Sequence, residues 1–189
     1  MGKRYQAILN YIDVDFLTFD NKFQSDLSLE DVTDSATGII IATPTETHFD
    51  YIVSLAALEI PILCEKPLTK EKEQLAHLKT IVKDRHLNLT MMMQYKMLDD
   101  PSSVGDSHYN YFKSGNDGLV WDCMQIIGLA RGHVSVSNGS PIWDCRLNGK
   151  NLKLSEMDLA YVNFVKDWLK YPGDDISKLI DIHQKVMAF

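Results

Sequence analysis

The sequence predicts an α/β protein in which a Rossmann-like parallel sheet is followed by a reduced α+β region. Two observations predict this fold class. Short apolar runs alternate with amphipathic helical segments over the first half of the chain, and the run at residues 38–42, Gly-Ile-Ile-Ile-Ala, has no polar alternation. A strand of that composition is typically covered on both faces, as in parallel sheets. With 189 residues, of which 45% are hydrophobic, the chain is long enough to bury a sizeable core.

The elements of the first half follow from apolar spacing and from the residues that interrupt it. Apolar side chains from Tyr5 to Ile12 recur at helical spacing, and residues 14–19 form an apolar run that predicts a strand ending at Asp20. No strand is predicted before the first helix, so the first strand of a complete sheet is missing. The elements predicted next are, in order, a strand at 38–42, a helix capped by Thr45, a strand at 60–64, a charged helix capped by Thr69 and a strand at 87–93. This order implies right-handed crossovers between parallel strands.

A turn-rich segment at 98–105 marks the expected boundary between two domains. We expect a Rossmann-like dinucleotide-binding domain at 1–97 and a shortened α+β substrate or oligomerisation domain at 98–189. The elements expected in the second domain are a strand at 108–112, a helix from about 119 to 130, a hairpin of strands 133–136 and 142–147, an amphipathic helix from Ser155 and a last helix capped by Asp174.

Composition and charge argue against several classes of protein. Asp and Glu (26) outnumber Lys and Arg (19), and the net charge of −7 argues against binding to nucleic acid or to a membrane surface. No apolar run is long enough to span a membrane, and the N-terminus does not resemble a signal peptide. The three cysteines are far apart, so neither a disulfide framework nor a thiolate metal site is expected. These features predict a cytoplasmic protein without a metal.

Chemically distinctive residues follow the ends of successive predicted strands. In an open parallel sheet, the carboxyl ends of the strands form the edge at which ligands bind. The residues expected at this edge are Asp20, Thr43, Pro44, His48, Glu65, Lys66, Gln94 and Tyr95. Each of them alone is a weak signal, but together they describe one rim, with Gln94 and Tyr95 on the substrate side.

The cofactor expectation depends mainly on Asp20. An acidic residue at this position can accept hydrogen bonds from a ribose 2′-hydroxyl, and its charge would repel a 2′-phosphate, so NAD is favoured over NADP. Thr43 and Pro44 would shape a loop beside the dinucleotide. The alternative interpretation of Asp20 is a solvated aspartate at a strand end, and that of Thr43 and Pro44 is an ordinary turn at the start of a helix. His48 lies in the first turn of the following helix, where a lone histidine is more often structural than ligand-binding.

Lys66 is the strongest catalytic candidate. It lies between a strand end and a proline, so its backbone is held, and an ammonium group in a cleft can donate or shuttle a proton. The alternative is an exposed ion pair with Glu65. Asp122 and Gln125 lie three residues apart on one helix face and could both hold a substrate. A structural role is equally consistent for Asp122 and is favoured for Gln125.

The sequence gives little support for a site that binds the phosphates of a dinucleotide. A dinucleotide fold needs a glycine-rich turn whose backbone N–H groups meet the pyrophosphate at a helix N-terminus. Gly2, Lys3 and Arg4 could be the end of such a turn, but no GxGxxG motif occurs in the chain.

Two segments at a characteristic separation resemble the Gfo/Idh/MocA family of oxidoreductases. These are residues 42–48, Ala-Thr-Pro-Thr-Glu-Thr-His, and residues 56–68, which end in Cys-Glu-Lys-Pro-Leu. They are similar to the TPxxxH and EKP segments of that family. Gly2–Tyr5 resembles the end of its glycine-rich turn, and Gly118–Asp122 resembles its GGxxxD segment. The resemblance spans most of the chain but is strong only over 38–68.

The resemblance implies a Rossmann domain joined to an α+β domain and hydride transfer between NAD(P) and sugars, inositols or related small molecules. It implies that Lys66 is catalytic or orients the substrate, that Glu65 lies near the nicotinamide and that Asp122 faces the substrate. Three departures stand out. The first strand and leading glycines are absent, Ile126 occupies the position of a frequent family histidine, and the second domain is short.

Three hypotheses for function follow. The first is an NAD-preferring oxidoreductase acting on a sugar or polyol, assembled as a homo-oligomer. The second is a catalytically inactive descendant that senses a ligand or serves in assembly, favoured by the missing glycine turn and by Ile126. The third is that the chain is a fragment of a longer enzyme, since Met1-Gly2 falls inside the expected glycine motif.

Overall fold

The computed structural model describes residues 1–20, 28–110, 121–138 and 143–188. A three-stranded parallel sheet in the order β1-β2-β3 lies at the centre of the first half. Its strands are β1 (Ile39–Ile41), β2 (Ile62–Cys64) and β3 (Leu89–Met91). The register places Leu63 between Ile40 and Thr90. This confirms the predicted parallel sheet, and the strands are shorter than the apolar runs that predicted them.

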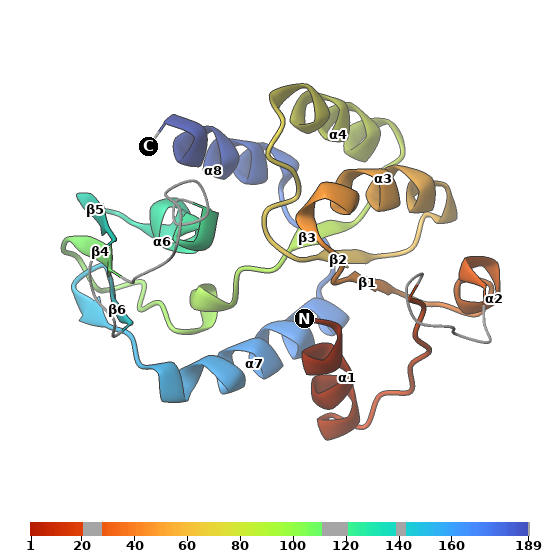
Figure 1. Ribbon diagram of the computed structural model, residues 1–189, viewed down its shortest axis with the longest axis horizontal. Coiled ribbons are helices and arrows are strands. Elements are labelled where there is room, and N and C mark those ends of the chain that lie inside the picture. Colours follow the sequence, from red (N-terminus) through yellow and green to blue (C-terminus); the bar gives the residue numbers. More distant parts are fainter. Residues whose placement is uncertain (21–27, 111–120, 139–142, 189) are drawn as a thin grey trace.

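Helices cover the two faces of this sheet (Figure 1). On one side lie α3 (Thr45–Leu55), which continues into η1 (Ala56–Leu58), and α4 (Lys72–Asp84). On the other side lie α1 (Gly2–Tyr11) and α7 (Met157–Lys170). Both faces of β2 and β3 are therefore buried, in agreement with the continuous apolar sequence of β2.

The strand predicted at residues 14–19 is wrong, because the described residues 14–20 contain no strand. Val14 and Phe16 are partly buried against the core, so the apolar pattern reflects packing. In a complete doubly wound sheet, residues 14–19 would be the second strand, which pairs with the first strand and with the third. No described segment supplies that first strand, and the apolar run has no backbone ladder to join. Its successor, α2 (Leu29–Thr33), is a short helix that begins with a capping box between Ser28 and Asp31.

The outer edge of β3 is covered by the turn between the last two helices. The Gly173 N–H donates to Thr90 Oγ1 at 2.9 Å, and the Asp174 N–H donates to the Leu89 carbonyl at 2.9 Å. The Asp174 carboxylate accepts from the Met91 N–H at 3.2 Å. The C-terminal segment therefore completes the hydrogen bonds of the first-half sheet.

The second half contains a four-stranded sheet in the order β5-β4-β6-β7. Its strands are β4 (Ser107–Asn110), β5 (Val134–Ser137), β6 (Asp144–Leu147) and β7 (Lys150–Asn151). The predicted hairpin of 133–136 with 142–147 is wrong, because β5 pairs in parallel with β4, and β6 pairs antiparallel with the other edge of β4. The helix α6 (Met124–Leu129) connects β4 to β5, which makes this connection a βαβ crossover. Residues 111–112, 119–120 and 142 of the predicted elements lie outside the described residues.

The last two helices return to the first half of the chain. After η3 (Leu154–Glu156), α7 packs against α1 and against η2 (Gln94–Met97). The final helix, α8 (Ile176–Ala188), packs against both α4 and α6. A Cβ atom on Gly128 would lie 2.9 Å from Ile182, so α6 and α8 are in close contact. In the part of the chain described here, no helix is long and apolar enough to cross a membrane.

Candidate functional site

Lys66 and Asp122 form an ion pair that joins the two halves of the chain. Lys66 follows the carboxyl end of β2, and Asp122 lies two residues before α6. The distance from Lys66 Nζ to Asp122 Oδ1 is 3.3 Å, and Nζ also lies 3.4 Å from the Trp121 carbonyl oxygen. The two side chains are 20% and 30% exposed, so the pair is shielded but still reachable from solvent. The structure thus brings together the two residues that the sequence predicted as catalytic.

Glu65, the neighbour of Lys66, is a buried carboxylate with partners for both oxygens. Its Oε1 accepts from the Tyr5 hydroxyl at 2.7 Å, and its Oε2 accepts from the Lys66 N–H at 3.2 Å. Burial and the charge of Glu65 raise the pKa of Tyr5 far above its ordinary value, so the hydroxyl remains a donor. Tyr5 lies in the second turn of α1, and this bond therefore fixes α1 against the loop after β2.

His48 links the loops that follow β1 and β2. Its ring is 1% exposed, with Nδ1 at 2.7 Å from the Pro67 carbonyl oxygen and Nε2 at 2.9 Å from the Thr43 carbonyl oxygen. Both ring nitrogens are thus engaged by backbone groups. This geometry supports the structural interpretation of His48, and a cofactor contact stays a prediction.

A second buried histidine, His183 on α8, contacts the same loop and was not predicted from the sequence. Its Nε2 accepts from the Leu68 N–H at 3.2 Å, and its Nδ1–H donates to the Leu179 carbonyl at 2.7 Å. Burial lowers the pKa of His183 to about 4. The histidine lies on the apolar stripe of a helix, at i+7 from Ile176, and this position is the sequence signal that could have identified it.

Gln94, Tyr95 and Gln125 lie together, and hydrogen bonds join them to one another. The Gln125 amide oxygen accepts from the Tyr95 N–H at 2.9 Å, and its NH₂ group donates to Gln94 Oε1 at 2.6 Å. Gln94 and Gln125 are 6% and 2% exposed. The geometry therefore supports the structural role favoured for Gln125, and contacts of these three residues with a substrate stay predictions.

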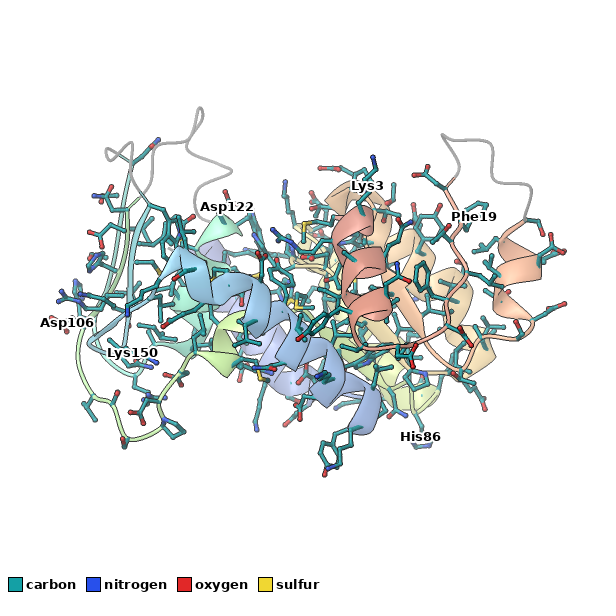
Figure 2. All side chains as sticks on the ribbon, turned by 90° about the horizontal axis from the view of Figure 1, so that it is seen from below. Lys3, Phe19, His86, Asp106, Asp122 and Lys150 are labelled. Atoms are coloured by element: carbon teal, nitrogen blue, oxygen red, sulfur yellow. The ribbon has the colours of Figure 1, made fainter. Side chains whose placement is uncertain are left out.

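The N-terminus of α1 lies on the same side of the molecule as Asp122. Figure 2 shows Lys3 and Asp122 on this side, with His86 on the opposite side. The first turn of α1 contains no acidic residue, and no side chain caps it. Gly2, Lys3 and Arg4 are exposed, and the Arg4 guanidinium lies 4.6 Å from the centre of the Tyr161 ring. A helix N-terminus with basic side chains is suited to an anionic group.

Two of the remaining predicted cofactor residues, Thr43 and Pro44, lie in the loop after β1. Thr47 Oγ1 donates to the Pro44 carbonyl and also lies 2.8 Å from Thr43 Oγ1, so the TPxxxH segment is organised by its own side chains. Asp20 is exposed at the end of the described segment 14–20. No cluster of three His, Cys, Asp or Glu side chains suited to a metal occurs among the residues that the structure describes.

Comparison with known families gives a match over the first half of the chain. Residues 3–93 match the family model described as "Oxidoreductase family, NAD-binding Rossmann fold", whose short name is GFO_IDH_MocA. A 30-residue segment is 57% identical to the rhizopine catabolism protein MocA of Rhizobium meliloti. That match covers 16% of this chain and 10% of the MocA protein.

Solved structures resemble this chain over most of its length. The WlbA (WbpB) dehydrogenase of Thermus thermophilus, solved with NAD and UDP-GlcNAcA, has a TM-score of 0.66 at 15% identity, with 98% of this chain and 89% of that chain covered. A myo-inositol dehydrogenase of Corynebacterium glutamicum has a TM-score of 0.61 at 14% identity, with 81% and 76% covered. A Gfo/Idh/MocA family oxidoreductase of Vibrio cholerae has a TM-score of 0.64 at 12% identity, with 98% and 85% covered. At these identities the similarity shows the fold.

Proposed function

Because residues 3–93 belong to the Gfo/Idh/MocA family of oxidoreductases with an NAD-binding Rossmann fold, we propose that this chain is an NAD-dependent oxidoreductase. It transfers hydride to or from a carbinol or carbonyl carbon of a sugar, inositol or related polyol. The observation that carries the proposal is the Lys66–Asp122 pair, 3.3 Å apart at the carboxyl end of a parallel strand.

The proposed cofactor is a dinucleotide, and we assign its parts to the residues predicted at the rim. The first turn of α1, with Gly2, Lys3 and Arg4, would hold phosphate groups, because a helix N-terminus and basic side chains both favour negative charge. Asp20 would accept hydrogen bonds from the ribose, and NAD is therefore the expected cofactor. The loop with Thr43 and Pro44 and the segment with Glu65 would border the dinucleotide.

Bound NAD would supply the hydride acceptor or donor. Lys66 would give a proton to the substrate oxygen or take one from it, because its ammonium group is partly exposed and its backbone is fixed by Glu65. Asp122 would orient this ammonium group and accept a hydrogen bond from a substrate hydroxyl. Ile126, at the position of the frequent family histidine, is fully buried in the core. Because its side chain has no group that can transfer a proton, we assign the proton transfer to Lys66.

The proposal includes the expected division of the chain into two domains. Residues 1–97 would bind the cofactor, and residues 98–189 would contribute Asp122 and the second sheet. Assembly into a homo-oligomer and a cytoplasmic location are further parts of the proposal, and they rest on the sequence.

The test is a dehydrogenase assay at 340 nm with NAD⁺ and a panel of inositols, hexoses and nucleotide sugars. We expect the wild-type chain to turn over at least one polyol or sugar. The rate should be about 10²–10⁴-fold lower in Lys66→Ala. Lys70→Ala is a matched control, since Lys70 belongs to an exposed pair with Glu46 at 3.9 Å. An equal rate in the wild type and Lys66→Ala would contradict the role of Lys66.

A further inference from the structure

His183 is a buried residue that the proposed chemistry does not use. Its side chain is 0% exposed, and it lies on α8, at the far end of the chain from Lys66. The Leu68 N–H can only donate and the Leu179 carbonyl can only accept, so these partners fix a neutral ring with the proton on Nδ1. The low pKa of about 4, caused by burial, agrees with a neutral ring at neutral pH.

The ring of His183 contacts both sides of the Lys66–Asp122 pair. On one side it holds the backbone of Leu68, two residues after Lys66. On the other side it packs against the Trp121 ring at a centroid distance of 6.2 Å and an interplanar angle of 55°. Trp121 directly precedes Asp122, and its carbonyl oxygen lies 3.4 Å from Lys66 Nζ. One side chain therefore touches the segments that present both members of the pair.

The helix that carries His183 provides a firm support. Close contact between Gly128 and Ile182 fixes α8 against α6, and α8 also packs on α4. The Leu68 backbone is fully buried, so its N–H would lack a partner if the imidazole acceptor were removed. A displacement of Leu68 would be transmitted through two peptide units to Lys66.

We propose that His183 is a positioning residue, which holds the loop after β2 and the Trp121–Asp122 segment together so that Lys66 stays within reach of Asp122. Its importance for turnover rests on the proposed function. Its effect on the Lys66–Asp122 pair does not, because the pair exists in the free protein.

The test measures the reactivity of Lys66 in the free protein. A short pulse of an acetylating reagent is followed by mass spectrometry, and acetylation of Lys66 is expressed relative to that of Lys70 in the same sample. In His183→Met, which removes both ring nitrogens, the Lys66:Lys70 ratio is expected to rise about fivefold as the ion pair loosens. His183→Gln can accept from the Leu68 N–H and donate to the Leu179 carbonyl but lacks the ring that packs on Trp121, so its ratio is expected to lie between those of the wild type and His183→Met.

His86→Gln is the matched control, because His86 is exposed and lies on the opposite side of the molecule from Asp122 (Figure 2). An unchanged ratio in His183→Met, or an equal rise in His183→Gln, would overturn the proposal. If His183→Met does not fold, Trp121→Leu removes the ring contact from the other side, and an unchanged ratio there would equally overturn it.

A separate binding measurement keeps the two proposals distinct. Failure of wild-type protein to bind NAD⁺ would remove the proposed function but leave the acetylation result intact. Turnover of a polyol with an unchanged acetylation ratio in His183→Met would remove the positioning role alone. Where turnover is found, a lower kcat in His183→Met with an unchanged KM for NAD⁺ would support positioning of the proton-transfer group.

Discussion

The Tyr5 hydroxyl donates a hydrogen bond of 2.7 Å to the buried Glu65 carboxylate, across 60 residues of sequence. This bond fixes the first helix to the loop that carries Lys66. The proposed phosphate-binding end of α1 and the proposed proton-transfer group are therefore parts of one connected structure. Tyr161 packs edge-to-face on Tyr5 at 6.5 Å and adds α7 to the same support.

Removal of the Tyr5 hydroxyl should destabilise the fold. In Tyr5→Phe, one oxygen of the buried Glu65 carboxylate loses its donor, and the free energy of unfolding should fall by about 1–3 kcal/mol. Urea unfolding followed by circular dichroism measures this change. Tyr11→Phe is the matched control, because Tyr11 is 72% exposed, and it should have almost no effect. Equal stability of Tyr5→Phe and wild type would show that the bond contributes nothing.

A change from Lys66 to arginine should separate proton transfer from charge. Arginine can keep the ion pair with Asp122, but its guanidinium group does not release a proton at neutral pH. In Lys66→Arg, kcat should therefore fall about 10²–10⁴-fold, while the Kd for NAD⁺ changes little. Steady-state kinetics and calorimetric titration measure the two quantities, with Lys70→Arg as control. Wild-type kcat in Lys66→Arg would assign Lys66 a purely electrostatic role.

Replacement of Asp20 should alter the choice of cofactor. Asp20→Ser removes the acceptor proposed for the ribose hydroxyls together with the charge that disfavours a 2′-phosphate. NADH should then bind about tenfold more weakly, and NADPH should bind more tightly than it binds to wild type. Fluorescence titration with both dinucleotides measures this. Asp15→Ser is the control, because Asp15 is also exposed and lies in the same segment. Unchanged affinities in Asp20→Ser would exclude Asp20 as the residue that reads the ribose.

The Asp99–Arg131 pair should contribute stability that depends on pH. Burial acts to raise the pKa of Asp99, but hydrogen bonds from Arg131 and Asn148 outweigh it, and the pKa lies below its ordinary value. The native state thus releases this proton more readily than the unfolded state. The stabilisation is present at neutral pH and is lost as pH falls through the native pKa.

Arg131→Ala should therefore lower the free energy of unfolding at pH 7, and its difference from wild type should shrink at about pH 3. Part of the difference should persist, because Arg131 also donates to the carbonyl oxygens of Asp100 and Ser103. Urea unfolding at the two pH values measures it, with exposed Arg85→Ala as control. A difference of the same size at both pH values would contradict a titrating contribution from Asp99.

The parallel sheet could be predicted because local patterns encode its strands. Lys66 and Asp122 were each identified from a separate motif, but the ion pair between them was not predicted, because it joins segments far apart in the sequence. The apolar run at 38–42 identified a strand, and the EKP segment identified the end of its neighbour. The errors concern strands whose pairing depends on distant segments. Residues 14–19 have the composition of a strand but no described strand to pair with, and β5 pairs with β4, which lies between β5 and β6 in the sheet.

The buried supports of the site were missed for a related reason. Tyr5 and His183 occupy positions in the apolar stripes of amphipathic helices, where the sequence shows burial but not the hydrogen-bond partner. Each partner lies more than 50 residues away, in the loop after β2. Short helix α2 was missed although Ser28 and Asp31 form a capping box, which is a local signal.

The most direct test of the account is thermal unfolding of the wild-type chain with increasing NAD⁺ or NADH. A ligand at about 100 times its Kd adds about 2.7 kcal/mol of stability, which raises the Tm of a chain of this size by several degrees. The account predicts such a rise with NAD⁺ or NADH and a smaller one with NADP⁺ or NADPH. The absence of any rise up to millimolar NAD⁺ and NADH would contradict the central claim that this chain binds a dinucleotide.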